Sequence, residues 1–256
     1  MAKKYLGQHF LFDPATLSRI VDVSGITPED TIVEIGPGPG SMTQILASRA
    51  KLVIAVELDD KLYMSLLARF EKVQNIELHH ADALKFDYSC IGIPFKVVAN
   101  IPYYITTPLI FMLMDAKPLL STMTLTIQKE VAERIVAAPG SKDYGVLSIS
   151  VQYFAKTKLE FVIPAASFKP VPKVDSAVIR IEMLEQPSVS VTDEGLFFKI
   201  VRAGFSQRRK TLSNALKALF PDIRRILVDT GIDPLRRAET LSMEEFAKLA
   251  DSIKNI

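Results

Sequence analysis

The sequence predicts an α/β fold, in which a mostly parallel sheet with helices on both faces precedes a small domain of helices alone. Three observations favour this architecture. Short β-branched runs alternate with helical segments through the first part of the chain. Two later β-like runs then follow one another without a clear helix between them. From Asp193 onward, only helical patterns occur.

Five strands are expected in the alternating part of the chain. They are residues 31–35, 51–58, 76–78, 95–99 and 123–127. Helices are expected over 41–50 and 130–136, and a third after Asp59, whose side chain is placed to cap it. The two later runs, 159–163 and 177–181, suggest an antiparallel pair at one edge of the sheet.

A change in composition separates the two predicted domains. Residues 185–190 (Glu-Gln-Pro-Ser-Val-Ser) have the character of a linker. We therefore expect a sheet-containing domain over residues 1–189 and an all-helical domain over residues 190–256.

The composition excludes several classes of protein. With 48% hydrophobic and 23% charged residues, the chain is neither disordered nor fibrous. Cys90 is the single cysteine, which excludes an intramolecular disulfide and a multi-cysteine metal site and favours a reducing compartment. The sequence has no apolar signal segment and no apolar run near the roughly 20 residues that span a bilayer. We expect a cytoplasmic monomer that binds neither metal nor membrane.

A glycine-rich turn follows the first predicted strand. Residues 36–40 read Gly-Pro-Gly-Pro-Gly, which lets a ligand approach the backbone closely. The turn alone could hold a dinucleotide, but that fingerprint places a third glycine where Ser41 stands. Pro37 and Pro39 also remove two N–H groups that a pyrophosphate needs. S-adenosylmethionine has no phosphate, so the loop favours it as the cofactor.

Two acidic residues at strand ends support the same cofactor. Glu57 follows the first glycine by 21 residues, where a carboxylate can accept hydrogen bonds from both ribose hydroxyls. Asp82 follows the third strand and can accept from the adenine amine of the cofactor. Open α/β sheets bind ligands at the carboxyl ends of their strands. These features together predict a Rossmann-like sheet of the class I S-adenosylmethionine methyltransferases.

The motif after the fourth strand indicates the methyl acceptor. The side-chain oxygen of Asn100 and the carbonyl oxygen of Ile101 can hold the two hydrogens of an adenine amine and direct its lone pair at the methyl group. Pro102 stiffens the turn, and Tyr103 offers a ring on which a flipped-out base can stack. The alternative is an ordinary turn before an amphipathic helix.

With these residues in line, nearly the whole chain resembles the ribosomal RNA adenine dimethyltransferases, the KsgA family. Residues 6–11 (Leu-Gly-Gln-His-Phe-Leu) are similar to the family's Gly-Gln-Asn-Phe-Leu, with His9 in place of the commoner Asn. Residues 168–178 resemble its Phe-x-Pro-x-Pro-Lys-Val-Asp-Ser-Ala-Val loop, and residues 205–211 its Phe-x-Gln-Arg-Arg-Lys-Thr segment.

The resemblance implies an enzyme that dimethylates two adjacent adenines near the 3′ end of small-subunit ribosomal RNA and acts in small-subunit biogenesis. It implies that Phe168 lies against the target base on the side opposite Tyr103. The cofactor-binding residues that it implies are His9, Leu11, Gly36, Gly38, Glu57, Asp82 and Asn100.

A basic cluster in the helical domain is the expected RNA contact. Against Asp222 alone, residues 199–225 carry Lys199, Arg202, Arg208, Arg209, Lys210, Lys217, Arg224 and Arg225. Such a cluster can be a solvated helix face or a phosphate footprint. The resemblance favours the second interpretation and places the contact at Arg208, Arg209 and Lys210.

Two other functions fit parts of the sequence. An antibiotic-resistance enzyme that methylates one adenine of large-subunit RNA shares the fold and the catalytic motif, but residues 207–210 and the Pro-Lys-Val-Asp loop fit it less well. A non-catalytic RNA-binding factor on this fold is opposed by the intact Glu57, Asp82 and Asn100. It is also opposed by the absence of a transit segment.

Overall fold

The structure, a computed structural model, describes residues 8–207 and 209–254 and divides into two compact units. The first comprises the described residues up to Ala132 together with Thr157–Met183, and the second comprises Glu133–Lys156 with the residues from Leu184 onward. The sequence predicted two continuous domains that meet near residue 190. The structure differs because Tyr144, Ile149 and Tyr153 are buried in the core of the helical unit.

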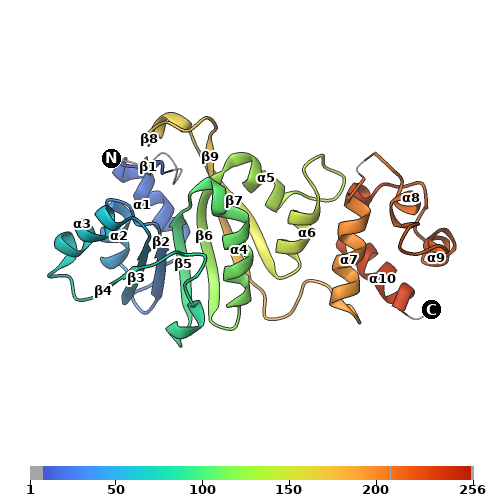
Figure 1. The fold of residues 1–256 in the computed structure, drawn as a ribbon, viewed down its shortest axis with the longest axis horizontal. Coiled ribbons are helices and arrows are strands. Elements are labelled where there is room, and N and C mark those ends of the chain that lie inside the picture. The colour runs from blue at the N-terminus through green and yellow to red at the C-terminus, as the bar shows by residue number, and fades with distance from the viewer. Residues whose placement is uncertain (1–7, 208, 255–256) are drawn as a thin grey trace. The chain divides into compact units, whose positions relative to one another are not determined.

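A seven-stranded sheet forms the centre of the first unit among the described residues, in the order β4-β3-β2-β5-β6-β9-β7 (Figure 1). The strands are β2 (Thr31–Ile35), β3 (Leu52–Glu57), β4 (Ile76–His80), β5 (Phe95–Asn100), β6 (Leu120–Gln128), β7 (Ala155–Ile163) and β9 (Ser176–Met183). β2 to β6 are parallel, and β9 is antiparallel to β6. The α/β class and the placing of the two late strands at one edge are therefore confirmed.

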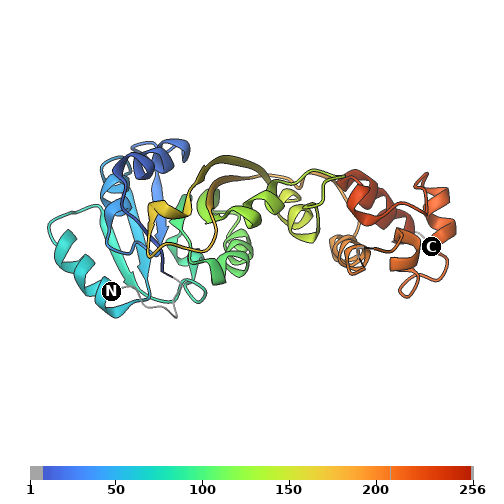
Figure 2. The same ribbon diagram turned by 90° about the horizontal axis from the view of Figure 1, so that it is seen from above.

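The five residues of β2 are all buried, as expected for a central parallel strand covered on both faces. Figure 2 shows α1 (Pro14–Val23) and α4 (Thr106–Asp115) on opposite faces of the sheet. On the first face, α1 and α2 (Ser41–Ala47) share a hydrophobic core with sheet residues such as Ile32 and Val98.

The helix expected after Asp59 is α3 (Asp60–Phe70). The Asp59 carboxylate accepts hydrogen bonds from the backbone N–H groups of Lys61 and Leu62, which confirms its role as the helix cap. Between β4 and β5 lies the short helix η2 (Tyr88–Ile91), and η3 (Tyr103–Ile105) leads into α4.

Two further strands have only two residues each, so no alternation of apolar and polar residues could predict them from the sequence. β1 (Phe10–Leu11) pairs antiparallel with β8 (Phe168–Lys169), so that Phe10 lies opposite Lys169 and Leu11 lies opposite Phe168. The helix η4 (Ala165–Ser167) precedes β8. This pairing brings the N-terminal segment beside the proline-rich loop, although 157 residues separate Leu11 from Phe168 in sequence.

The second unit is built from helices around their own hydrophobic core. The helices are α6 (Val146–Gln152), α7 (Glu194–Phe205), α8 (Leu212–Leu216), α9 (Ile223–Asp229), η5 (Ala238–Thr240) and α10 (Met243–Lys254), and α5 (Lys129–Val136) reaches into this unit. Within residues 8–207 and 209–254, we find no helix with the length and apolarity that a membrane crossing needs.

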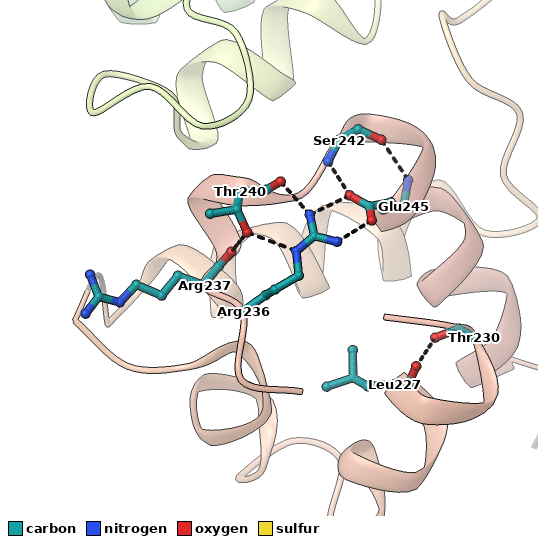
Figure 3. Close-up of polar contacts among 7 residues, drawn as sticks. All are labelled: Leu227, Thr230, Arg236, Arg237, Thr240, Ser242 and Glu245. Carbon is teal, nitrogen blue, oxygen red and sulfur yellow. Dashed lines mark hydrogen bonds and ion pairs between the residues drawn. The ribbon is translucent and has the colours of Figure 1, made fainter. Parts of the chain in front are cut away.

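Polar contacts fix the segment before α10 (Figure 3). The Arg236 guanidinium contacts both carboxylate oxygens of Glu245 and also donates to the Thr240 carbonyl. Glu245 accepts from the Ser242 N–H while the Ser242 hydroxyl accepts from the Glu245 N–H, which is a reciprocal helix cap. The Arg236 carbonyl accepts the N–H of Leu212 at 2.7 Å and so ties this segment to the start of α8.

Candidate active site

The carboxyl ends of the parallel strands bring the predicted site residues together. Ile35 lies opposite Val56 and Ala99, and Glu57 lies opposite His80, so the strands end at one edge. A cavity opens there, at the place where open α/β sheets bind their ligands. The predicted residues that line it are His9, Gly36, Gly38, Glu57, Asp82, Asn100, Ile101, Pro102 and Tyr103.

The glycine loop approaches an aromatic ring closely. Gly38 has a positive φ of 58°, and a Cβ atom there would lie 2.8 Å from the Phe10 ring. Any other residue would combine backbone strain with a steric clash. The loop also meets Glu57, because the Gly38 N–H donates to Glu57 Oε2 at 3.2 Å. Glycine at position 38 thus allows both the close packing on Phe10 and the turn towards Glu57.

Glu57 is buried at the end of β3, with 4% of its surface exposed. Its Oε1 accepts the N–H of Asp59 at 2.8 Å. Burial raises the pKa of the Glu57 carboxyl, whereas the N–H groups of Asp59 and Gly38 favour the charged form. A carboxylate has about four lone-pair positions, so these two contacts leave acceptor capacity for a ligand.

Asp82 lies just beyond β4 and is half-buried in the cavity wall. Its Oδ1 accepts the N–H of Leu84 at 2.9 Å, which fixes the carboxylate at the start of the following turn. Asp82 thus adds a carboxylate to the same wall as Glu57.

Asn100 is the last residue of β5, and its amide is oriented by the N-terminal segment. Asn100 Nδ2 donates to the His9 carbonyl oxygen at 2.9 Å. Because the amide nitrogen is engaged there, the side-chain oxygen is the atom left to accept a hydrogen bond.

The next three residues form the turn into η3. Ile101 is buried and its N–H donates to the Thr126 carbonyl at 3.1 Å. Tyr103 is half-buried, and its hydroxyl lies 2.8 Å from the Ser176 hydroxyl. Burial raises the pKa of the Tyr103 phenol, so this group stays protonated at neutral pH.

Two residues predicted for this site do not lie in the cavity wall. Phe168 is 1% exposed and packs in the hydrophobic core with Leu11 and Leu17. The pairing of β8 with β1 carries its ring inward, so the structure does not place Phe168 against a base opposite Tyr103. Leu11 is 5% exposed and lines a second, smaller cavity instead.

That smaller cavity is also lined by Glu34 and Asn100. The Glu34 side chain on β2 is fully buried, and neither of its carboxyl oxygens has a hydrogen-bond partner among the described residues. Burial raises the pKa of Glu34 to about 8. The nearby Thr43 hydroxyl favours the charged form, but it lies outside hydrogen-bonding geometry and its effect is smaller than that of burial. The sequence analysis did not single out Glu34, although a carboxyl group within a buried β-branched run could have indicated an unusual residue there.

The basic segment lies in the second unit. Arg209 and Lys210 are exposed just before α8, whereas Arg208 lies outside the described residues. Sequence reasoning missed Phe10, Leu58 and Tyr104 as residues of the cavity wall. Their only signal was adjacency to predicted site residues.

Comparisons with known proteins identify relatives of the whole chain. A family model described as "Ribosomal RNA adenine dimethylase" matches residues 1–255. The "Ribosomal RNA small subunit methyltransferase A" of Geobacillus sp. (strain WCH70) is 45% identical, over 99% of this chain and 92% of its own length. The protein of the same name from Clostridium botulinum (strain Langeland / NCTC 10281 / Type F) is 46% identical, over 99% of this chain and 94% of its own length.

Two solved structures have the same fold over most of the chain. A dimethyladenosine transferase from Plasmodium falciparum matches with a TM-score of 0.80 and 30% identity, covering 94% of this chain and 96% of its own. The 23S rRNA methyltransferase ErmE matches with a TM-score of 0.78 and 27% identity, covering 96% of this chain and 99% of its own.

Proposed function

We propose a residue-level account of catalysis from one premise, which is that the chain belongs to the ribosomal RNA adenine dimethylase family. The protein is an S-adenosylmethionine-dependent methyltransferase that dimethylates adenine in small-subunit ribosomal RNA. ErmE, a 23S rRNA methyltransferase, has the same fold, but the relatives at 45–46% identity are named as small-subunit ribosomal RNA methyltransferases.

The cofactor is proposed to lie in the larger cavity, along the glycine loop. Gly36 and Gly38 let it approach the backbone, Glu57 accepts from the ribose hydroxyls, and Asp82 accepts from the adenine amine. The wall fits these groups, because acceptors face a cavity that is otherwise largely apolar. When bound, S-adenosylmethionine supplies an electrophilic methyl group on a sulfonium.

The target amine is proposed to bind at the turn after β5. One observation carries this assignment: the hydrogen bond from Asn100 Nδ2 to His9 leaves the Asn100 oxygen as the acceptor in the cavity wall. That oxygen and the Ile101 carbonyl hold the amine hydrogens, and Pro102 fixes the turn. Two acceptors draw the nitrogen towards tetrahedral geometry and direct its lone pair at the methyl group. The proton leaves once the nitrogen is cationic, so no strong base is required.

The second unit is proposed to bind RNA through Arg208, Arg209 and Lys210. Exposed cations such as the latter two contact phosphates without reading sequence. We propose that the substrate is the small-subunit RNA, free or in an assembling particle, and that two adjacent adenines near its 3′ end are modified. The enzyme is further proposed to act as a cytoplasmic monomer without a metal ion.

Mapping the methylated nucleotides tests the proposal. The purified chain is incubated with S-adenosylmethionine and either small-subunit or large-subunit RNA from cells that lack the gene, and modified adenines are located by mass spectrometry. We expect dimethylation of two adjacent adenines in the small-subunit RNA alone. Modification of a large-subunit adenine would instead support the resistance-type function. RNA binding without any methyl transfer would support the non-catalytic one.

A further inference from the structure

His9, in the N-terminal segment, contacts both Asn100 and Tyr103 of the proposed target site. It is also where this chain carries a ring in place of the commoner Asn of the family motif. Its backbone carbonyl accepts from Asn100 Nδ2, its ring stacks on Tyr103, and its Nδ1 lies 2.7 Å from the Pro170 carbonyl oxygen. The contact to Asn100 needs only a backbone, whereas the other two belong to the side chain.

The stack with Tyr103 covers one of the two faces of that ring. The ring centroids are 5.5 Å apart and the planes are inclined by 28°. This geometry is that of an offset aromatic pair, and it leaves no room for a base between the rings. The hydroxyl end of Tyr103 is held separately by Ser176 at 2.8 Å. The phenol is therefore fixed at its tip by Ser176 and along one face by His9.

The His9 ring is itself fixed from the opposite direction. A carbonyl oxygen accepts hydrogen bonds only, so Nδ1 is the donor to Pro170 and carries the proton when the imidazole is neutral. Pro170 follows β8, whose pairing with β1 places it beside His9. The chain of contacts thus runs from the loop after β8, through the imidazole, to the Tyr103 ring.

We propose that the His9 side chain is a positioning residue, which sets the plane of the Tyr103 ring so that the target adenine stacks on the face that His9 does not cover. The inference rests on the proposed function and assigns the side chain to Tyr103 instead of to the cofactor. The Phe168 ring lies in the core and does not contact the base, so the orientation of the Tyr103 ring depends on His9 and Ser176.

Two substitutions separate the ring from the hydrogen bond. His9→Phe keeps an aromatic ring over Tyr103 and loses the donor to Pro170. His9→Asn keeps a donor and loses the ring. His79→Asn is the matched control, because the His79 ring also contacts an aromatic ring, with its centroid 5.2 Å from that of Phe86. Neither His79 nor Phe86 lines either of the two cavities.

Three measurements are made on each full-length variant with the mapped small-subunit RNA. They are the single-turnover rate of methyl transfer at saturating RNA, the fluorescence of 2-aminopurine in place of a target adenine, and the dissociation constant of S-adenosylmethionine. A base that stacks on Tyr103 is quenched relative to one that is flipped out without stacking. The fluorescence therefore reports the base position, which a loss of stability alone does not change.

We expect His9→Asn to slow transfer by about 2- to 12-fold, the range that one aromatic pair supports. Its 2-aminopurine signal should rise, whereas its cofactor affinity should stay within about twofold of wild type. His9→Phe keeps the ring and loses only the donor to Pro170, so its transfer rate and 2-aminopurine signal should fall between those of His9→Asn and wild type. His79→Asn should match wild type in all three measurements.

The inference is overturned if His9→Asn transfers methyl groups at the wild-type rate, or if His9→Phe is as slow as His9→Asn. It is also overturned if weaker cofactor binding accounts for the whole loss. Wild-type enzyme that leaves small-subunit adenines unmodified defeats the proposed function and this inference with it. Normal dimethylation by every variant defeats the inference alone.

Discussion

The cavity in the first unit holds its polar groups by internal hydrogen bonds, whereas the basic segment of the second unit presents its charges from exposed positions. Glu57, Asn100 and Tyr103 each make at least one hydrogen bond to the protein. Arg209 and Lys210 are solvent-exposed. Methyl transfer needs atoms in fixed places, while phosphate binding is electrostatic and nearly additive. Single changes in the cavity should therefore have larger effects than single changes in the basic segment.

The largest effect is expected from Asn100→Ala. It removes one of the two acceptors proposed for the adenine amine and leaves Tyr103 and the basic segment in place. Both methyl transfers should slow by about 100-fold or more, as when a preorganised group at a reacting centre is lost. Single-turnover assays that resolve monomethyl from dimethyl adenine measure this.

RNA affinity is the control for that variant, and it should remain near the wild-type value because phosphate contacts dominate it. Near-normal dimethylation by Asn100→Ala would remove the residue from catalysis. Lost RNA binding with a normal rate at saturation would make it a docking residue, and the comparison between the two regions would fail.

The next effect is expected from Glu57→Ala on cofactor binding. The change removes the charged acceptor proposed for the ribose and also frees the N–H groups of Gly38 and Asp59. A charge-assisted hydrogen bond contributes about 1.5–3 kcal/mol, so the dissociation constant should rise by roughly 10- to 150-fold. Calorimetry measures it. Glu57→Gln keeps one acceptor oxygen, so its dissociation constant should lie between those of wild type and Glu57→Ala. An unchanged constant for Glu57→Ala would contradict the proposed contact between Glu57 and the ribose.

Glu34 sharpens the comparison, because it is a buried acid beside the cavity wall whose oxygens have no partner among the described residues. Its pKa is about 8 in the folded protein against 4.5 as the ordinary value. Between these values the unfolded chain is ionised while the folded carboxyl keeps its proton, so stability falls as pH rises. The slope from this group is at most about 1.4 kcal/mol per pH unit.

Glu34→Gln is uncharged at every pH and should lose this slope. Urea unfolding of both proteins at pH 5, 6, 7 and 8 measures the difference in free energy of unfolding. The variant should gain stability relative to wild type as pH rises through this window. Parallel pH profiles would show that the pKa of Glu34 is not raised in the folded protein.

The smallest effects are expected from Arg209→Ala and Lys210→Ala, tested singly. Each should weaken RNA binding a few-fold and lower the slope of log affinity against log salt by up to about 0.7, the value for one phosphate contact on a single strand. Cofactor affinity should not change. Lys248→Ala, at an exposed position on α10, is the matched control. A slope equal to that of the control would assign the segment to ordinary surface.

Local sequence was sufficient wherever a pattern repeats within a few residues. The β-branched run at 31–35, the cap at Asp59 and the glycine loop each express a preference of the local chain, and the structure has all three. The convergence of Glu57, Asp82 and Asn100 also followed, because parallel strands end at one edge. The small-subunit RNA function followed from motifs that the family model and the relatives confirm.

Tertiary structure alone decided what distant segments do to one another. Pairing of β1 with β8 buried Phe168 and moved His9 over Tyr103, and neither strand is long enough to leave a pattern. Residues 133–156 belong to the helical unit because their apolar side chains pack in its core. The linker composition near residue 190 does not reveal this packing. Sequence fixes which residues prefer burial and which turns are allowed, but contacts between segments far apart in the chain depend on packing of the whole fold.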